Sequence, residues 1–466
     1  MEKLHIIHTN DLHSHFENFP LIARFINQQR QLDLQKQQQT FLFDVGDASD
    51  RVHPLTEATM AQANIDWMNQ QRYDAVTIGN SEGLYYDHQI LEHMYDRANF
   101  PVIVGNLYES QGKLPAFAQT YKILQTNAGT KLGILGLTAP YLLTYPLLNW
   151  DIRLVQDVLP ALIAKVRPQV DVLILLSHLG INTDRYLCQK YPQLDIIIGG
   201  HSHHLLPTGT IIGKTLVTAA QKYGNYIGNI YLTLENHHLQ TRTAQTVATK
   251  SLPHLKTDKK SELEYQRKGE ELLKKQLVAK IPYSLEARPT GEHPAINLAL
   301  KALEQVTNTK AAMLNSGLFL SDLPAGIITQ NDIHQQLPHA IHLMKTTLSG
   351  RELWRFLMEV NKNRNFLRHF PQKGMGFRGK IFGEIILDGV AINENTRQVF
   401  YQGQELDPVK KYEIALLDHY LFIPFFPTLQ IVGENQLLYP DFLRTVFARY
   451  LAQKFPLKVG AKNDRN

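Results

Sequence analysis

The first half of the chain repeats one arrangement that narrows its fold more than any other feature. Short, continuous apolar runs lead directly into polar residues, and these runs span residues 4–8, 40–45, 75–78, 102–104, 132–137, 172–176 and 196–198. Amphipathic segments that favour helices, such as 55–71 and 159–166, lie between several of them. Apolar strands that alternate with helices predict a layered α/β domain with buried sheets.

The second half begins after a change in composition. Residues 252–281 are charged, favour a helix and nearly lack glycine and proline, until Pro282 interrupts them. At 466 residues the chain is long enough for two or three domains. We expect an α/β domain, a linker helix and an α+β domain over residues 1–250, 251–281 and 282–466 respectively.

The overall composition restricts the partners of the protein. An apolar share of 44% and a charged share of 20% are typical of a soluble globular protein. A net charge of +5 suits an anionic small molecule, and the scattered basic residues do not indicate a nucleic acid polymer.

Several features of the sequence indicate the cellular compartment of the protein. The single cysteine, Cys188, excludes a disulfide within the chain and favours a reducing compartment. Polar residues 8–11 interrupt any signal-peptide core, and no apolar run reaches the length of a membrane span. We therefore expect a cytoplasmic protein with no membrane partner. The sequence indicates no particular oligomeric state.

Metal-binding residue types follow five of the predicted strands. These are Asp11 and His13 after LHIIHTN, Asp44 and Asp47 in FLFDVGD, Asn80 after AVTIG, His178 after VLILLS, and His201 and His203 after DIIIGG. Loops at the carboxyl ends of strands converge on one ligand site in open α/β folds, so these side chains are expected to meet. Imidazole, carboxylate and amide oxygen suit Mn, Zn, Co, Fe or Ni, and one carboxylate can bridge two ions about 3.5–4 Å apart.

The charge of such a site would favour a phosphate ligand. Two divalent cations carry four positive charges, and Asp11 and Asp47 supply two negative ones. The remaining positive charge would bind a phosphate and lower the pKa of a bridging water. The sequence therefore predicts a dinuclear metal centre.

The motifs TNDLHSHFE, DVGD, GNSE, SHLG and GGHSHH occur in an order and spacing that resemble the 5′-nucleotidase family of calcineurin-like metallophosphoesterases. This resemblance extends from residue 4 to about residue 240 and indicates a bacterial, intracellular member. It implies a β-sheet sandwich flanked by helices. The C-terminal half resembles the substrate-binding domain of that family through residues 315–317, the stretch ITQNDIHQQLPH, and residues 348–353.

The resemblance implies a role for each metal-binding position. One ion would be held by Asp11, His13 and His203, the other by Asn80, His178 and His201, with Asp47 as the bridge between them. Asn80 and His178 would also count as catalytic residues. Asp44 would support its loop, and Asn106 would lie near the site without binding metal. A metal-bridging hydroxide is the expected nucleophile.

The chain departs from the family at the catalytic dyad. The usual pattern is GNHEFD, in which the histidine contacts the phosphate and the closing aspartate orients it. Ser81 and Leu84 occupy those two positions. Asp87 and His88 are possible substitutes, although a polar helix start is the commoner meaning of such residues.

The second domain departs as well, because no arginine follows Asn315-Ser316-Gly317 closely. Asn315, Phe377, Arg378 and Phe422 are the candidates for substrate binding, with the rings stacking on a base and the arginine binding an anion. Each ring would more often simply be part of the core.

These expectations converge on a hydrolase of phosphate esters, with nucleotides as the substrates and nucleotide catabolism as the role. It would be of the 5′-nucleotidase or cyclic-nucleotide phosphodiesterase type. Loss of the dyad leaves two alternatives open. The first is a catalytically weakened nucleotide-binding sensor, and the second is an enzyme that prefers cyclic phosphodiesters or anhydrides.

Overall fold

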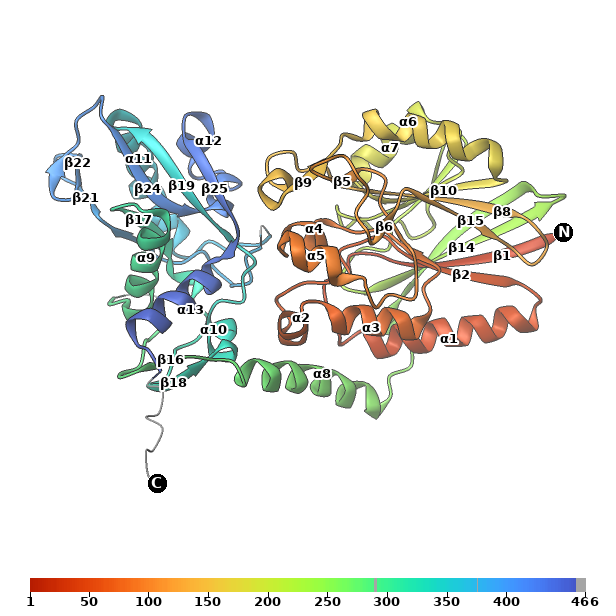
Figure 1. The fold of residues 1–466 in the computed structure, drawn as a ribbon, viewed down its shortest axis with the longest axis horizontal. Coiled ribbons are helices and arrows are strands. Elements are labelled where there is room, and N and C mark those ends of the chain that lie inside the picture. The colour runs from red at the N-terminus through yellow and green to blue at the C-terminus, as the bar shows by residue number, and fades with distance from the viewer. Residues whose placement is uncertain (289–290, 375, 458–466) are drawn as a thin grey trace, which may run out of the picture. The chain divides into compact units, whose positions relative to one another are not determined.

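The computed structural model describes residues 1–288, 291–374 and 376–457. The chain forms two compact units that divide after Gly269, here called unit 1 and unit 2. In Figure 1 unit 1 runs from red to green, and unit 2 continues to blue. The helix that crosses the division is α8, Lys256–Lys274.

Unit 1 contains two large sheets. The first has the order β15 (His238–Ala248), β14 (Tyr226–Glu235), β1 (Glu2–Thr9), β2 (Gln39–Asp44), β3 (Ala75–Val76), β4 (Val102–Ile103), β6 (Ala118–Gln119). The second has the order β12 (Thr210–Ile212), β13 (Thr215–Thr218), β11 (Ile196–Gly199), β10 (Val172–His178), β8 (Lys131–Thr138), β7 (Tyr121–Gln125). The strands that lead into the metal-binding motifs are parallel within each sheet.

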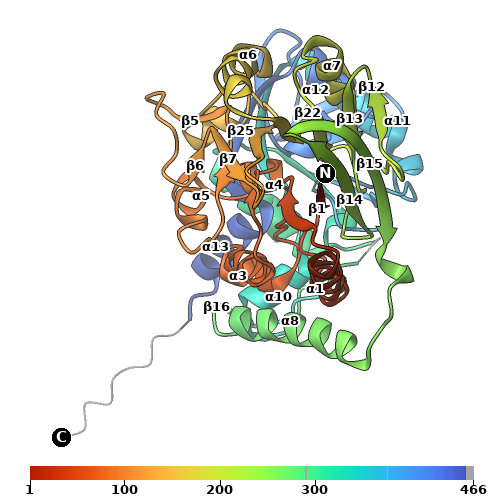
Figure 2. The same ribbon diagram turned by 90° about the vertical axis from the view of Figure 1, so that its right-hand side faces the viewer.

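The two sheets pack face to face between helices. In β10, Ile174 and Leu176 enter the core between the sheets, whereas Leu173 and Leu175 face a second core with α6 (Val155–Val166) and α7 (Ile181–Lys190). This alternation follows from the two-residue period of a strand. Figures 1 and 2 show α6 and α7 on one side of unit 1, and α1 (Phe19–Gln35) and α3 (Gln62–Gln71) on the other. The predicted layered sandwich is thus confirmed.

The helix predicted over residues 55–71 is broken in the structure. It forms α2 (Pro54–Thr59) and α3, because Met60 and Ala61 between them have φ angles of 46° and 66°. These left-handed conformations end the first helix and redirect the chain.

The short helices near the motifs of unit 1 are α4 (Asn80–Leu84) and α5 (His88–Met94). Strands β5 (Leu107–Glu109) and β9 (Trp150–Ile152) pair with each other, and a 3₁₀ turn, η1 (Tyr145–Leu148), precedes β9.

Helix α8 packs on unit 1 over most of its length. Arg24 of α1 donates to Asp258 at 2.9 Å, and the rings of Phe16 and Tyr265 lie 4.7 Å apart. Residues 277–281, at the end of the predicted linker helix, instead form strand β16 (Leu277–Ile281), which pairs with β18 (Gly326–Thr329). No helix in the described part of the chain is long and apolar enough to cross a membrane.

Unit 2 is an α+β domain around a five-stranded sheet. The sheet order is β20 (Ile385–Asp388), β17 (Ala312–Asn315), β24 (Lys411–Leu417), β19 (His342–Ser349), β25 (Glu434–Phe442). The helices are α9 (Pro294–Thr307), α10 (Gln330–Gln336), α11 (Gly350–Leu367), α12 (Pro427–Ile431) and α13 (Leu443–Lys454). A small sheet contains β21 (Val390–Asn393), β22 (Gln398–Tyr401) and β23 (Gln404–Glu405).

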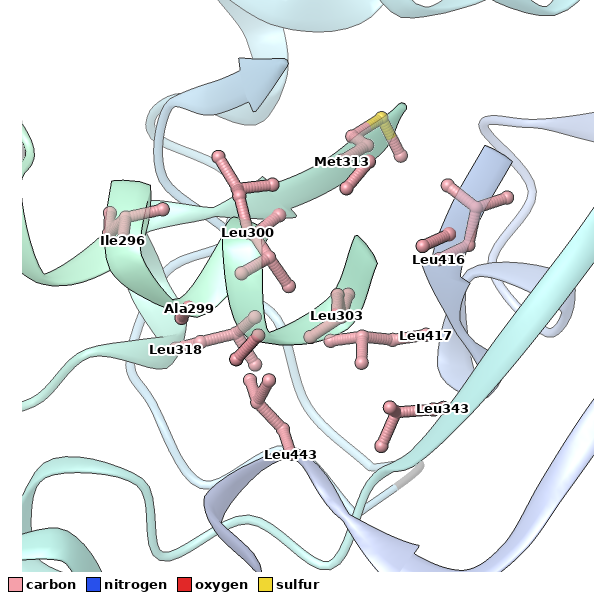
Figure 3. Close-up of a cluster of buried hydrophobic side chains, with 14 of the residues drawn as sticks. Ile296, Ala299, Leu300, Leu303, Met313, Leu318, Leu343, Leu416, Leu417 and Leu443 are labelled. Carbon is pink, nitrogen blue, oxygen red and sulfur yellow. The ribbon is translucent and has the colours of Figure 1, made fainter. Parts of the chain in front are cut away.

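The core of unit 2 joins α9 to this sheet. Leu300 and Leu303 of α9 lie against Met313 of β17 and Leu417 of β24, and Leu443 of α13 closes the cluster (Figure 3). Each of these side chains is at least 98% buried. Burial of this order contributes roughly 1.5–3 kcal/mol per large apolar side chain, so unit 2 has a core of its own.

Candidate metal centre

The seven predicted metal-binding side chains meet at the carboxyl ends of the strands of unit 1. Asp11 and His13 lie after β1, Asp47 after β2, Asn80 at the first residue of α4, His178 at the end of β10, and His201 and His203 after β11. Because β1 and β2 belong to one sheet and β10 and β11 to the other, both sheets contribute to the cluster.

Asp11, His13 and His203 form one half of the cluster. Their candidate ligand atoms all lie within 4.8 Å of one another. The Nε2 atoms of His13 and His203 are 3.4 Å apart, and His203 Nε2 lies 3.5 Å from Asp11 Oδ1. Two imidazole nitrogens and a carboxylate oxygen thus face a common point.

Asn80, His178 and His201 form the other half. The Asn80 Oδ1 atom lies 2.8 Å from His201 Nδ1 and 3.3 Å from His178 Nε2. Asp47 lies between the halves, because its Oδ2 atom is 3.5 Å from both His13 Nε2 and His178 Nε2. This is the position that a bridging carboxylate requires.

Two of the histidine rings, those of His178 and His13, have a partner near their outer nitrogen. His178 Nδ1 lies 2.7 Å from the Val45 carbonyl oxygen, and His13 Nδ1 lies 3.5 Å from Asp50 Oδ2. A ring that donates through Nδ1 presents Nε2 as the free ligand nitrogen, which is the usual arrangement around a metal-binding histidine. The backbone amide of His201 donates to Asp11 Oδ1 at 3.0 Å and so ties the two halves together.

Charges within the cluster shift its pKa values strongly. Burial opposes charge on His178, but the negative charge of Asp47 outweighs burial and raises the pKa of His178 to about 10. Burial would raise the pKa of Asp47, yet His178 and His13 hold it well below its ordinary value. Burial and the nearby positive His178 lower the pKa of His201 to about 4.

The backbone at the cluster is strained. Five of the seven residues have left-handed φ angles between 46° and 68°: Asp11, His13, Asp47, His201 and His203. Non-glycine residues adopt this region rarely, and it persists only where surrounding contacts enforce it. Here the amides of Asp11 and His13 donate to the carbonyls of Gly46 and Asp47 at 3.0 and 2.8 Å.

The residues of this chain fit divalent metal ions. Carboxylate, imidazole and amide oxygen are the donors that such ions take, and the strained loops aim them inward. Calcineurin-like phosphoesterases bind divalent metals, and the Asp and His groups gathered here are suited to that task.

Glu82, in the GNSEG motif, holds together two loops that carry residues of the cluster. Its buried carboxylate accepts from the backbone amides of Asp47 and Gly79 at 2.9 Å and from that of Ser49 at 2.8 Å. No role for Glu82 was predicted from the sequence. A signal existed, since an acidic residue three positions after a helix N-cap is typical of a capping box.

Gly79, the first residue of GNSEG, allows the close approach of these loops. A Cβ at Gly79 would lie 2.1 Å from Asp47 Oδ1, and a Cβ at Gly46 would lie 2.3 Å from the Gly79 nitrogen. The Ser81 amide donates to the same Asp47 Oδ1 at 2.7 Å. The GNSEG backbone therefore orients the Asp47 carboxylate.

The positions of the missing dyad are closed to solvent. Ser81 is 0% exposed, and within the described residues its hydroxyl has no hydrogen-bond partner; Leu84 is 7% exposed. Gly83 stands where the family pattern has phenylalanine, and a Cβ there would lie 2.1 Å from the Tyr145 hydroxyl oxygen. Tyr145 thus fills the space beside α4.

The possible substitutes for the dyad, Asp87 and His88, have other partners in the fold. The Asp87 side chain accepts from the Ile90 amide at 2.8 Å and caps α5. His88 Nε2 lies 2.9 Å from Glu109 Oε2, and its ring stacks on Trp150 at 4.0 Å. These contacts are those of a helix start and a packed histidine.

Asp44 and Asn106 serve the fold around the cluster. Asp44 accepts from Thr9 Oγ1 and from the Gly46 amide, and burial raises the pKa of its carboxyl to about 8. The Asn106 amide group donates to the Thr138 carbonyl at 2.7 Å and accepts from the Thr138 amide at 3.0 Å. Both residues therefore have partners other than a metal.

A tyrosine that the sequence did not suggest touches the cluster. The Tyr141 hydroxyl lies 3.4 Å from His201 Nε2, and Tyr141 is 40% exposed. It lies in the loop after β8, at the same sheet edge as His178. No periodicity or motif marks this residue in the sequence.

The substrate-binding candidates of unit 2 differ from one another in exposure. Asn315 is fully buried, donates to the Phe382 carbonyl and accepts from the Tyr420 hydroxyl at 2.7 Å. Phe377 is 3% exposed and stacks on His339 with centroids 5.1 Å apart.

Arg378 and Phe422 are less enclosed. The Arg378 amide donates to His339 Nδ1 at 2.8 Å, and its guanidinium donates to the Phe377 carbonyl at 3.2 Å. Phe422 is 54% exposed, and its backbone amide donates to the His419 carbonyl. The structure thus presents Phe422, and not Phe377, as an exposed ring.

Both units match known families. The family model described as calcineurin-like phosphoesterase matches residues 4–205, and the one described as 5′-nucleotidase, C-terminal domain, matches residues 275–422. The uncharacterized metallophosphoesterase YunD of Bacillus subtilis is 34% identical over 463 residues, which cover 97% of this chain and 100% of that protein.

Two further similarities concern proteins with named activities. A 5′-nucleotidase of Diplobatis ommata is 25% identical over 288 residues, which cover 53% of this chain and 49% of that relative, about half of its length. A crystal structure of a putative 5′-nucleotidase from Staphylococcus aureus, in complex with alpha-ketoglutarate, superimposes with a TM-score of 0.67. It is 17% identical, covers 98% of each chain, and shows a shared fold.

Proposed function

This chain belongs to the 5′-nucleotidase family of calcineurin-like metallophosphoesterases and is a phosphoester hydrolase, and we propose that it hydrolyses nucleotides with two divalent metal ions. Asp11, His13 and His203 would hold one ion. Asn80, His178 and His201 would hold the other, and Asp47 would bridge them.

One observation carries this proposal. The Asp47 Oδ2 atom is equidistant, at 3.5 Å, from a ring nitrogen of each half of the cluster. Four histidines and two carboxylates converge there, and the His178 and His13 rings each have a partner near their outer nitrogen. Such convergence of buried polar atoms is costly unless a ligand joins them, and divalent cations suit this donor set.

The bound ions would supply a water of lowered pKa as nucleophile and would offset the negative charge of the phosphoryl oxygens. The chain itself would fix the geometry. Glu82 and the Ser81 amide keep Asp47 oriented through hydrogen bonds of 2.7–2.9 Å. The Val45 carbonyl keeps the His178 ring turned so that Nε2 faces the centre. Rigid positioning of this kind lowers the barrier without further movement.

The buried Ser81 and Leu84 affect the choice of substrate. Neither can protonate a leaving group, and such assistance is typically worth about 10²–10⁴ in rate. A ribose alkoxide leaves poorly without a proton, whereas a phenolate or a phosphate leaves readily. We therefore favour anhydrides such as nucleoside diphosphates, and aryl phosphates, over nucleoside monophosphates.

Unit 2 would supply contacts to the nucleoside. The exposed ring of Phe422 suits stacking on a base, and the guanidinium of Arg378 suits an anion. Asn315 and Phe377, which are buried, would support this surface from within. A nucleotide-catabolic role and a cytoplasmic location, favoured by the single cysteine Cys188, belong to the same proposal.

A screen of hydrolysis by the purified protein tests this proposal. With Mn²⁺, Zn²⁺ or Co²⁺ present, we expect turnover of aryl phosphates and nucleoside diphosphates at kcat/KM values well above that for AMP. Cyclic nucleotides in the same screen test the phosphodiesterase type. Rapid AMP hydrolysis with little sensitivity to the leaving group would contradict the proposed substrate preference.

The second candidate function is a nucleotide sensor, and the closed dyad positions favour it. It predicts tight nucleotide binding with no hydrolysis of any ester under the same conditions. The complete set of seven metal-binding side chains favours the enzyme, because a sensor has no need of a dinuclear centre.

A further inference from the structure

The loss of the dyad leaves the phosphoryl group of the substrate without its usual side-chain donor. Ser81 is buried and too short to reach out of α4, and Leu84 has no polar atom. His88 is engaged with Glu109 and Trp150. A replacement has to touch the cluster, carry a donor and remain accessible to a ligand.

Tyr141 meets these three conditions. Its hydroxyl lies 3.4 Å from His201 Nε2, and its ring meets the His201 ring edge to face with centroids 6.0 Å apart. The other nitrogen of the same ring, Nδ1, lies 2.8 Å from Asn80 Oδ1. Only the width of one imidazole therefore separates the phenol from the metal-binding amide, and Tyr141 remains 40% exposed.

The loop that carries Tyr141 is held firmly. The Tyr141 carbonyl accepts from the amides of Thr144 and Tyr145, each at 3.1 Å, and from the Thr144 hydroxyl at 3.3 Å. Tyr145 is fully buried, and its hydroxyl occupies the space left by Gly83 in α4. The same helix that lost the dyad thus anchors the loop that brings the phenol beside His201.

We propose that the Tyr141 hydroxyl donates a hydrogen bond to a phosphoryl oxygen of the bound substrate and replaces the phosphate contact of the missing histidine. The phenol keeps its proton, so no bond is made or broken at Tyr141. A donor directed at charge that develops in the transition state is worth roughly 10²-fold in rate. This inference rests on the proposed hydrolase function.

Tyr141→Phe tests the inference, with Tyr186→Phe as the control. Tyr186 lies on α7, is 53% exposed, and has its ring beside the Lys190 ammonium group. We expect Tyr141→Phe to lower kcat/KM by roughly 10²-fold, by the same factor across a series of aryl phosphates. Binding of inorganic phosphate to the metal-loaded variant, measured by calorimetry, should weaken as well. Tyr186→Phe should match the wild type in both measurements.

Three results would overturn the inference. Equal kcat/KM and phosphate affinity in wild type and Tyr141→Phe would exclude a contact with the substrate. A loss that grows with the pKa of the leaving group would place the phenol on the leaving oxygen instead. A loss of bound metal would make Tyr141 a support of His201. Inactive wild-type protein would be a failure of the proposed function, and phosphate binding by the two proteins would still test Tyr141.

Discussion

Residues of recognisable motifs behave differently in the two units. In unit 1, His178 and His13 are hydrogen-bonded or paired on their outer side, and their Nε2 atoms face Asp47. In unit 2, Asn315 uses its side chain on the Phe382 carbonyl and the Tyr420 hydroxyl, and Phe377 is packed against His339. Both regions are buried, and both carry family motifs.

The difference separates two uses of a buried polar side chain. A residue that serves the fold completes its hydrogen bonds within the chain, as Asn315 does. A residue that serves a ligand is oriented by hydrogen bonds within the chain, but one of its polar atoms faces the other ligand-binding residues of the cluster. Unit 1 contains a group of the second kind, which marks its candidate functional residues, whereas Asn315 and Phe377 of unit 2 are of the first kind.

Asp47→Ala should have the largest effect, because Asp47 serves both halves of the cluster. We expect wild-type protein to bind close to two Mn²⁺ or Zn²⁺ ions per chain and the variant to lose the pair, together with hydrolysis of aryl phosphates. Elemental analysis of loaded protein measures this. Asp66→Ala, which removes a surface carboxylate paired with Arg97, is the control. Full metal content in Asp47→Ala would refute the assignment of the bridge.

Glu82→Gln should have the next largest effect. The amide NH₂ group of glutamine would face the backbone N–H groups of Asp47, Ser49 and Gly79, which now donate to the carboxylate. Loss of an orienting partner of this type typically lowers metal affinity by about 10- to 100-fold. Metal titration of the variant measures the change. The control is Glu92→Gln, on the surface of α5, which should leave metal affinity unaltered. If Glu82→Gln bound metal as tightly as the wild type, Glu82 would have no part in orienting the site.

The buried histidines of unit 2 should make it sensitive to acid. Burial lowers the pKa of His339 and of His419 to about 3, so folded unit 2 keeps both rings neutral. The unfolded chain takes up these protons near pH 6.5. The protonation of these two rings therefore does not reduce the free energy of unfolding of unit 2 above pH 6.5. As the pH falls from 6.5 toward 3, this free energy decreases by up to about 1.4 kcal/mol per pH unit for each ring.

His419→Leu isolates this effect. Within the described residues neither ring nitrogen of His419 has a hydrogen-bond partner, so an apolar side chain loses no such contact. Thermal unfolding at pH 7, 5 and 4 should show a smaller loss of Tm in the variant than in the wild type. An identical pH dependence would show that His419 does not titrate on unfolding. His178 has the opposite shift, since Asp47 raises its pKa, and should not contribute acid sensitivity.

Phe422→Ala should have the smallest effect, and it tests the substrate surface of unit 2. Because this ring is 54% exposed, we expect no loss of stability and a several-fold rise in KM for nucleotides alone. Phe366→Ala, with a ring 57% exposed on α11, is the control. If Phe422→Ala has the same KM as the wild type for nucleotides as well as for aryl phosphates, base stacking at this position would be excluded.

The sequence predicted the elements that carry chemistry better than those that support it. The strands before Asp11, Asp47 and His178 were predictable because continuous apolar runs end there in polar residues. The break at Met60 and Ala61 was not, because helix propensity changes little across it and the left-handed turn is set by tertiary contacts.

Candidate roles of side chains could be predicted only where the order and spacing of the motifs indicate them. The predicted metal-binding positions follow predicted strands, whereas Tyr141 lies in a loop without periodicity, and only the fold brings it beside His201. The sequence alone does not separate the roles of Phe377 and Phe422, since an aromatic residue suits a core as well as a ligand-binding surface. Exposure separates them, and exposure depends on the packing of the whole unit.

A metal titration tests the central claim most directly. Metal-free protein is titrated with Mn²⁺ while the hydrolysis of an aryl phosphate is followed. The account predicts no turnover without metal and a rate that stops rising at two equivalents per chain. Turnover by metal-free protein, or a plateau at one equivalent with no further binding, would contradict a dinuclear hydrolase.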